Sequence, residues 1–205
     1  MSEKESTIQV AGISGSLRAG SYTRRAVESA LQGAAESGAE TRLIDLNDYN
    51  LAFRVGKDEA GDTSGVSRLR EQIKQADGII LGTPEYHGSL SGVLKNALDL
   101  MGFDEFEGKM IGLVGVSGGH MGAFDALNTL RNIGRALHAW VIPEQASVPE
   151  AWKVFTEDGK LADPQLEKRL KEVGRQVARF ARLHKCENAL DFVRDWQKAQ
   201  PNPGA

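Results

Sequence analysis

The chain alternates short apolar runs with amphipathic segments, and no other feature of the sequence restricts the possible folds as strongly. Two of the runs, Gly78–Thr83 and Met110–Val116, consist almost entirely of apolar residues. Such runs are typical of strands that are buried on both faces of a parallel sheet. The alternation predicts five strands: Ile8–Ile13, Thr41–Leu46, Gly78–Thr83, Met110–Val116 and Ala139–Ile142.

Helices are predicted between these strands, because apolar residues recur there at the spacing that places them on one helix face. In the first such segment, Ala26, Val27 and Ala30 share a face. Strands that alternate with helices predict an α/β fold in which helices cover both faces of a parallel sheet with strand order 2-1-3-4-5 and right-handed crossovers. The predicted helices are Thr23–Ala35, Gly65–Ala76, Ser91–Met101, Ala123–Leu137 and Pro164–His184.

Length and composition predict one compact domain. We expect residues 1–185 to form it and residues 186–205 to be a C-terminal appendage that is partly docked or frayed. The net charge of −3, with acidic and basic residues mixed, gives no electrostatic basis for binding nucleic acid or an anionic membrane. The N-terminal segment has no apolar signal-peptide core and no apolar run reaches membrane-spanning length, so we expect a cytoplasmic protein.

The segment that joins the first predicted strand to the first helix has the composition of a phosphate-binding loop. Its sequence over 14–23 is SGSLRAGSYT. The glycines permit a tight turn with exposed N–H groups, and the following helix N-terminus adds positive partial charge. The hydroxyls of Ser16, Ser21 and Thr23 can donate hydrogen bonds, and Arg18 adds a charged guanidinium that can donate two hydrogen bonds to one anion. The loop contains neither Gly-Lys-Ser/Thr nor Gly-x-Gly-x-x-Gly, so it suits a terminal monophosphate. The alternative is a plain connection rich in small residues.

Two further unusual loops follow the third and fourth predicted strands. Pro84–Ser89 combines a rigid proline, the flat ring of Tyr86 and a glycine that lets a planar ligand such as a flavin approach. Ser117–Gly122 has three glycines in six residues, which indicates a backbone close to something flat or to another loop. The alternatives are a tyrosine that packs on the next helix and a turn that needs positive φ. Because ligands of open parallel sheets bind beyond the carboxyl ends of the strands, we expect the three loops to converge.

At these residues the chain resembles the NADPH-dependent FMN reductase family, which includes quinone reductases, azoreductases, chromate reductases and an arsenic-resistance branch. The resemblance rests on GSLRAGSYT (15–23), GTPEYHGSLSGVLKNALD (82–99) and SGG (117–119), and it extends to about Pro149. It implies a flavodoxin-like fold, FMN held without a covalent link, and NADPH as hydride donor, with NADH as an alternative. It also implies homodimers that often pair into tetramers.

The resemblance extends to individual residues. Tyr86 and His87 are candidate substrate-side groups, and no residue is assigned as catalytic because the flavin carries the hydride chemistry. Many family members have asparagine where this chain has Thr23 or His87. The residues that match the phosphate site are Ser16, Arg18, Ser21, Tyr22 and Thr23, and those that match the ring site are Pro84, Glu85, Tyr86, His87, Ser117, Gly118 and Gly119.

Several charged residues keep two interpretations. His87 and His120 either line the ring pocket or are turn residues, and without a third ligand they do not predict a metal site. Glu85 either handles protons or is a solvated turn carboxylate. Arg24 and Arg25 open the first helix, where cations are unfavourable unless an anion such as a nicotinamide 2′-phosphate lies nearby; the alternative is a solvated helix face.

Together these features predict an oxidoreductase that passes two electrons from NAD(P)H through FMN to a small acceptor such as a quinone, with donor and acceptor taking turns at one site. The alternative is a flavodoxin-like electron carrier or a flavin-binding module without turnover. We also expect a homodimer or homotetramer in which Asn47–Ser64 reaches a neighbour's pocket. That segment carries Tyr49, Leu51, Phe53 and Val55, which a small domain has little reason to expose.

Overall fold

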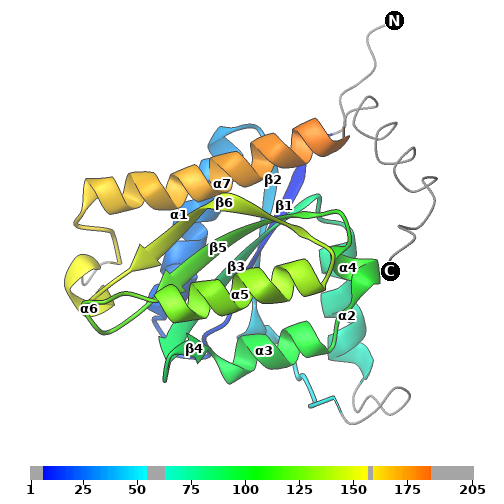
Figure 1. Ribbon diagram of the computed structural model, residues 1–205, viewed down its shortest axis with the longest axis horizontal. Coiled ribbons are helices and arrows are strands. Elements are labelled where there is room, and N and C mark those ends of the chain that lie inside the picture. The colour runs from blue at the N-terminus through cyan, green and yellow to red at the C-terminus, as the bar shows by residue number, and fades with distance from the viewer. Residues whose placement is uncertain (1–6, 55–62, 157–158, 186–205) are drawn as a thin grey trace, which may run out of the picture.

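The computed structural model describes residues 7–54, 63–156 and 159–185, which form one open sheet covered by helices (Figure 1). The predicted appendage, 186–205, lies outside the described residues. The elements in chain order are β1 (Gln9–Ser14), α1 (Tyr22–Glu36), β2 (Glu40–Asp45), a 3-10 turn (Leu46–Asp48), α2 (Thr63–Lys74), β3 (Gly78–Tyr86), β4 (Ser89–Leu90), α3 (Gly92–Asp99), α4 (Phe103–Phe106), β5 (Met110–Val116), α5 (Phe124–Ala136), β6 (Trp140–Val148), α6 (Ala151–Val154) and α7 (Pro164–Lys185).

The sheet has the strand order β2-β1-β3-β5-β6, and neighbours in this order run parallel. This confirms the predicted order 2-1-3-4-5. The structure adds a sixth strand, because the two-residue β4 pairs antiparallel with the end of β3. The sequence did not reveal β4, since a strand of two residues leaves no periodic pattern.

Two strands are longer than the apolar runs that predicted them. β3 continues to Tyr86, so Pro84–Tyr86 is strand where a loop was expected. Pro84 pairs with Val116 of β5, while Glu85 and Tyr86 pair with β4. β6 continues to Val148 and includes Pro143 beside a break in register opposite β5. A proline is tolerated in β6 because this strand lies at the edge of the sheet.

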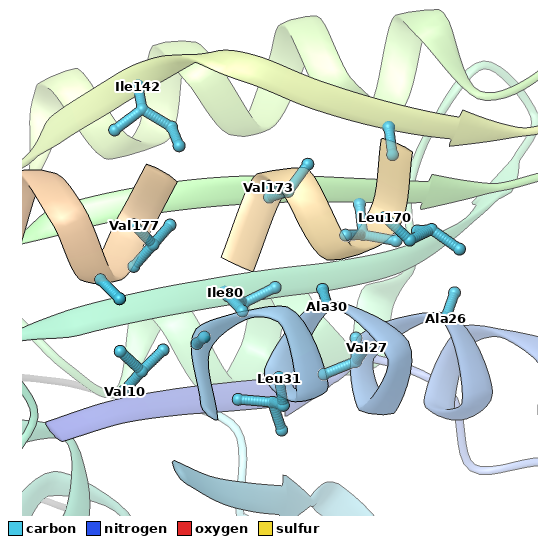
Figure 2. Close-up of a cluster of buried hydrophobic side chains, with 14 of the residues drawn as sticks. Val10, Ala26, Val27, Ala30, Leu31, Ile80, Ile142, Leu170, Val173 and Val177 are labelled. Atoms are coloured by element: carbon cyan, nitrogen blue, oxygen red, sulfur yellow. The ribbon is translucent and has the colours of Figure 1, made fainter. Parts of the chain in front are cut away.

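Each face of the sheet carries its own core. On one face, α1 and α7 pack against strand residues such as Val10 and Ile80 (Figure 2). On the other face, residues of α2, α3 and α5 pack against Ile79, Leu81 and Leu113. Alternate residues of β3 thus enter opposite cores, which explains why this run lacks a polar side.

Two glycines let α1 and α7 lie side by side. A Cβ at Gly33 of α1 would be 1.9 Å from the Lys171 carbonyl oxygen, and one at Gly174 of α7 would be 1.7 Å from the Ala30 carbonyl oxygen. Any side chain at either position would push the helices apart. This close contact fixes the second half of α1 against α7. No helix in the described part of the chain is both long and apolar enough to cross a membrane.

Candidate functional site

The loops after β1, β3 and β5 meet at the carboxyl edge of the sheet, and buried hydrogen bonds join the first two. The Gly15 N–H donates to the Gly82 carbonyl oxygen at 2.8 Å. The Ser91 hydroxyl donates to the Gly15 carbonyl oxygen at 2.6 Å, and the Ser91 N–H donates to Thr83 Oγ1 at 3.0 Å. Ser91 was not among the predicted site residues, although its place before α3 marks it as a helix N-cap.

The first loop contains buried hydroxyls and unshared backbone donors. Ser16, Ser21 and Thr23 are buried, and the Ser21 hydroxyl caps α1 by accepting from the Arg24 N–H. Among the described residues, none of the three hydroxyls donates a hydrogen bond to the protein, and the N–H groups of Tyr22 and Thr23 find no acceptor. The first turn of a helix leaves such N–H groups free, so the loop is a ready anion site.

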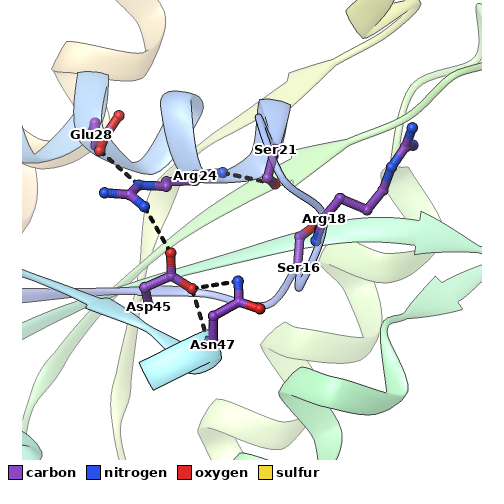
Figure 3. Close-up of polar contacts among 7 residues, drawn as sticks. All are labelled: Ser16, Arg18, Ser21, Arg24, Glu28, Asp45 and Asn47. Atoms are coloured by element: carbon purple, nitrogen blue, oxygen red, sulfur yellow. Dashed lines mark hydrogen bonds and ion pairs between the residues drawn. The ribbon is translucent and has the colours of Figure 1, made fainter. Parts of the chain in front are cut away.

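Arg18 and Arg24 have opposite situations, although both lie beside this loop. The Arg18 side chain is exposed and makes no ion pair or hydrogen bond with any described residue. Figure 3 shows it extending away from Arg24. Arg24 binds Glu28 at 3.0 Å and Asp45 at 2.9 Å, and the hydrogen bond to Glu28 raises the pKa of its guanidinium. The anions beside Arg24 are thus carboxylates of the protein, and its side chain is half-exposed, so the structure favours the solvated helix face over a 2′-phosphate site at Arg24.

The second loop is a tight hairpin between β3 and β4. Its two central residues, His87 and Gly88, have φ values of 51° and 73°. Positive φ at both positions is the type I′ pattern that favours Asn-Gly, and histidine is one of the few other residues found there. The side chains of Tyr86 and His87 are exposed at the hairpin tip. Tyr86 therefore does not pack into the core, and its ring is available to a ligand.

The carboxylate of Glu85, one of the predicted ring-site residues, binds the protein itself. Its carboxylate accepts the Ala126 N–H at 3.0 Å, in the first turn of α5. The N-cap residue of α5, Ala123, has no side chain that can cap the helix. Glu85 supplies that cap from β3, and Ser147 adds a second contact by accepting the Ala123 N–H at 2.8 Å. The prediction of Glu85 as a solvated turn carboxylate is wrong, because the residue is half-buried and paired.

The third loop is fastened to the segment that follows β6. The Ser117 N–H donates to the Val148 carbonyl oxygen, and the Ser117 and Gly119 carbonyl oxygens accept from Ala151 and Glu150 at 3.0 and 3.1 Å. Trp152 Nε1 donates to the Gly118 carbonyl oxygen at 3.3 Å. With its carbonyl oxygens engaged, the loop presents the bare backbone of its glycines.

The two interpretations of this glycine loop apply to different residues. Gly122 has a φ of 79°, so its glycine is required by a turn. At Gly118, by contrast, a Cβ would meet no heavy atom within 4 Å. This position leaves room for something outside the described residues to approach the backbone. Among the residues that the structure describes, no group of three or more His, Cys, Asp and Glu side chains has the arrangement of a metal site.

Comparison with known proteins decides the family. The model of the NADPH-dependent FMN reductase family matches residues 8–153. The chain belongs to this family. It is 34% identical over 174 residues to an NADPH-dependent FMN reductase, ArsH, of Shigella flexneri, covering 82% of this chain and 67% of that one. It is 35% identical over 179 residues to an FMN-dependent NADPH-azoreductase of Staphylococcus haemolyticus, covering 82% and 92%.

Solved structures agree with this membership. The reductase superimposes on FerB of Paracoccus denitrificans, a flavoenzyme NAD(P)H:(acceptor) oxidoreductase, with a TM-score of 0.64 at 27% identity, covering 87% of this chain and 99% of that one. An NADH:FMN oxidoreductase, EMOB, shares the fold with a TM-score of 0.69 at 21% identity, covering 88% and 91%. The predicted flavodoxin-like fold, the oxidoreductase class and the use of FMN and NAD(P)H are confirmed.

The long segment after β2 is less available for contact with a partner chain than expected. Tyr49 lies under the Arg68 guanidinium, 4.1 Å from its ring centre, and Leu51 packs against the core of α2 and α3. Phe53 is 77% exposed. Val55 lies outside the described residues. Two of the four apolar residues that suggested a partner chain are thus accounted for within the reductase itself.

Proposed function

We propose that this reductase holds FMN between its three loops and passes two electrons from NAD(P)H to a quinone-like acceptor, with donor and acceptor occupying the same place in turn. The observation that carries the proposal is the first loop, where an unpaired arginine, three buried hydroxyls and free N–H groups surround the N-terminus of α1. Azo compounds are a second acceptor class, because relatives of this chain are azoreductases.

The first loop has the donors that a terminal phosphate requires. Ser16, Ser21 and Thr23 can each donate a hydroxyl proton to a phosphate oxygen, and the N–H groups of Tyr22 and Thr23 add the field of the helix N-terminus. Arg18 can turn toward the same anion, since no carboxylate in the described part of the chain holds it. The loop offers one charged group, which fits a monophosphate better than a pyrophosphate.

The other two loops suit a flat ring. Pro84–His87 forms one side through the hairpin, and Ser117–Gly119 forms the other through backbone that carries no side chain at Gly118 and Gly119. Bound FMN would supply the hydride chemistry itself, so the chain needs no catalytic base. Tyr86 and His87, exposed at the hairpin tip, are placed to contact whichever substrate lies over the ring.

The proposal extends to assembly. Large apolar side chains around the three loops remain exposed, and a ligand pocket normally buries most of its ligand. We propose that a second copy of the reductase covers them. Light scattering should then give at least twice the chain mass of 22.2 kDa at micromolar concentration, and a fully active monomer would contradict this part. The residues that we expect the second copy to cover are Leu17, Tyr86 and Trp152.

Two measurements test the central proposal. Denaturation of the purified protein should release FMN and not FAD, and apoprotein should take up added FMN. Initial velocities with NADPH and a quinone should give parallel double-reciprocal lines, because both substrates use one place in turn. Intersecting lines would show that donor and acceptor bind together, and a preparation that carries FAD would overturn the cofactor assignment.

A further inference from the structure

A separate cavity lies beside the third loop, and we call it the side cavity. Its volume is about 350 Å³, within the range of about 300–1,000 Å³ that is usual for ligand pockets. His120 and Met121 of the third loop form one wall, and the start of α5, the end of β6 and the start of α7 form the others. The third loop thus contributes His120–Gly122 to the side cavity and Ser117–Gly119 to the proposed flavin site.

The side cavity combines an apolar surface with a free cation. Phe124, Leu127 and Leu166 provide the apolar part, and Arg169 of α7 lies at the edge. Arg169 is exposed and makes no ion pair or hydrogen bond with any residue that the structure describes. Such a surface suits a flat aromatic ring that carries an anionic group.

The acidic residue of the side cavity does not neutralise Arg169. Asp163 accepts the N–H groups of Gln165 at 2.8 Å and Leu166 at 3.3 Å, so its carboxylate caps α7. The positive end of the helix dipole offsets the charge of a carboxylate in this position. The arginine therefore keeps its positive charge available to a ligand.

We propose that the side cavity binds the adenosine part of the nicotinamide nucleotide and that Arg169 contacts its 2′-phosphate, which makes Arg169 the residue that favours NADPH over NADH. This inference rests on the proposed function, since the nicotinamide must reach the flavin ring that we propose to lie against the third loop. The sequence suggested Arg24 for this role, but Arg24 already forms ion pairs with Glu28 and Asp45. Arg169, by contrast, makes no ion pair within the described residues.

Calorimetry with 2′,5′-ADP and 5′-AMP tests the site directly, with FMN-loaded protein and with apoprotein. These probes share adenosine and differ in the 2′-phosphate. Wild-type protein should prefer 2′,5′-ADP by about ten- to a hundredfold, the usual worth of a charge-assisted contact. Arg169→Ala should remove this preference, while Arg179→Ala, an exposed arginine further along α7, should keep it. Equal affinity of wild type and Arg169→Ala for 2′,5′-ADP would overturn the proposal.

Steady-state kinetics give a second measurement. In Arg169→Ala, kcat/KM for NADPH should fall by about tenfold or more, whereas kcat/KM for NADH should stay near the wild-type value. A rise in KM for the acceptor with an unchanged nucleotide preference would assign the side cavity to the acceptor and overturn the proposal. Failure of the proposed function would look different, because a protein without bound FMN could still distinguish 2′,5′-ADP from 5′-AMP in the calorimeter.

Discussion

The first and third loops lie at the same edge of the sheet, but their backbone groups differ in whether they have hydrogen-bond partners. In the first loop, the N–H groups of Tyr22 and Thr23 and the guanidinium of Arg18 have no partner within the described residues. In the third loop, the carbonyl oxygens of Ser117–Gly119 accept hydrogen bonds from the segment that follows β6. The first loop keeps backbone donors free, and the third loop has its carbonyl oxygens engaged.

This difference indicates two kinds of recognition. Free N–H groups, hydroxyls and an unpaired arginine select a ligand by charge, as an anion site must. The third loop, whose carbonyl oxygens are hydrogen-bonded, selects a ligand by shape, because no heavy atom lies near the position of a Cβ at Gly118. A mononucleotide with a charged end and a flat end requires both. Substitutions that change FMN binding, stability or neither of them test this difference between the loops.

The largest effect is expected at Arg18. Arg18→Ala should cost about 1.5–3 kcal/mol of FMN binding, which is about ten- to a hundredfold in Kd, because a charge-assisted contact to phosphate is lost. The unfolding temperature of the apoprotein should stay unchanged, since the Arg18 side chain has no partner among the described residues. Fluorescence titration with FMN measures the first quantity and thermal unfolding the second.

Arg24→Ala is the matched control for Arg18. It removes an exposed ion pair to Glu28 and a pair to the buried carboxylate of Asp45, so it should lower stability by about 1–3 kcal/mol and leave FMN binding nearly unchanged. If Arg18→Ala bound FMN with full affinity, the phosphate would have to lie outside the first loop.

A larger side chain in the third loop should weaken FMN binding. Gly118→Leu places a side chain where no heavy atom lies within 4 Å of the Cβ, so the apoprotein should unfold at the wild-type temperature. The same side chain should weaken FMN binding by about 1–3 kcal/mol, the usual cost of overpacking a site. Gly115→Ala is the contrasting variant, because its methyl group would lie 2.7 Å from the Ala123 Cβ and should lower stability. A Gly118→Leu protein that is unstable but binds FMN normally would show that this glycine serves the fold alone.

A smaller effect is expected at Glu85, which connects the second loop to α5. Glu85→Ala should lower the free energy of unfolding by about 1 kcal/mol, as the loss of a helix cap does. The unfolding temperature should fall by about 2–4 °C in a protein of this size. Glu85→Gln keeps an acceptor for the Ala126 N–H and should retain most of the stability. Unchanged stability with loss of hydride transfer in Glu85→Ala would instead indicate proton handling.

The smallest effect on stability is expected at His87. Asparagine adopts positive φ readily, so His87→Asn should change the free energy of unfolding by no more than about 0.5 kcal/mol. FMN affinity should also stay the same, while KM for the acceptor should rise because the imidazole at the hairpin tip is lost. Unchanged KM would leave His87 with a role in the turn alone. Steady-state kinetics beside thermal unfolding distinguish these outcomes.

Much of the architecture could be predicted from local patterns. The apolar runs identified the five long strands, and parallel topology then required the loops after β1, β3 and β5 to share one edge of the sheet. The short β4 and the strand character of Pro84–Tyr86 could not be predicted in this way. They depend on pairing with a neighbouring strand, and pairing is a property of two segments together.

The sequence by itself determined the fold, the composition of the three loops and the place where they meet, because these follow from periodicity and from the direction of the strands. Only the tertiary structure decided which charges are free. Arg24 is occupied because β2 brings Asp45 to it, and Glu85 caps α5 because β3 ends beside Ala126. Arg18 and Arg169 meet no such carboxylate among the described residues. A side chain's partner depends on which distant elements approach it, and the local sequence holds no record of that approach.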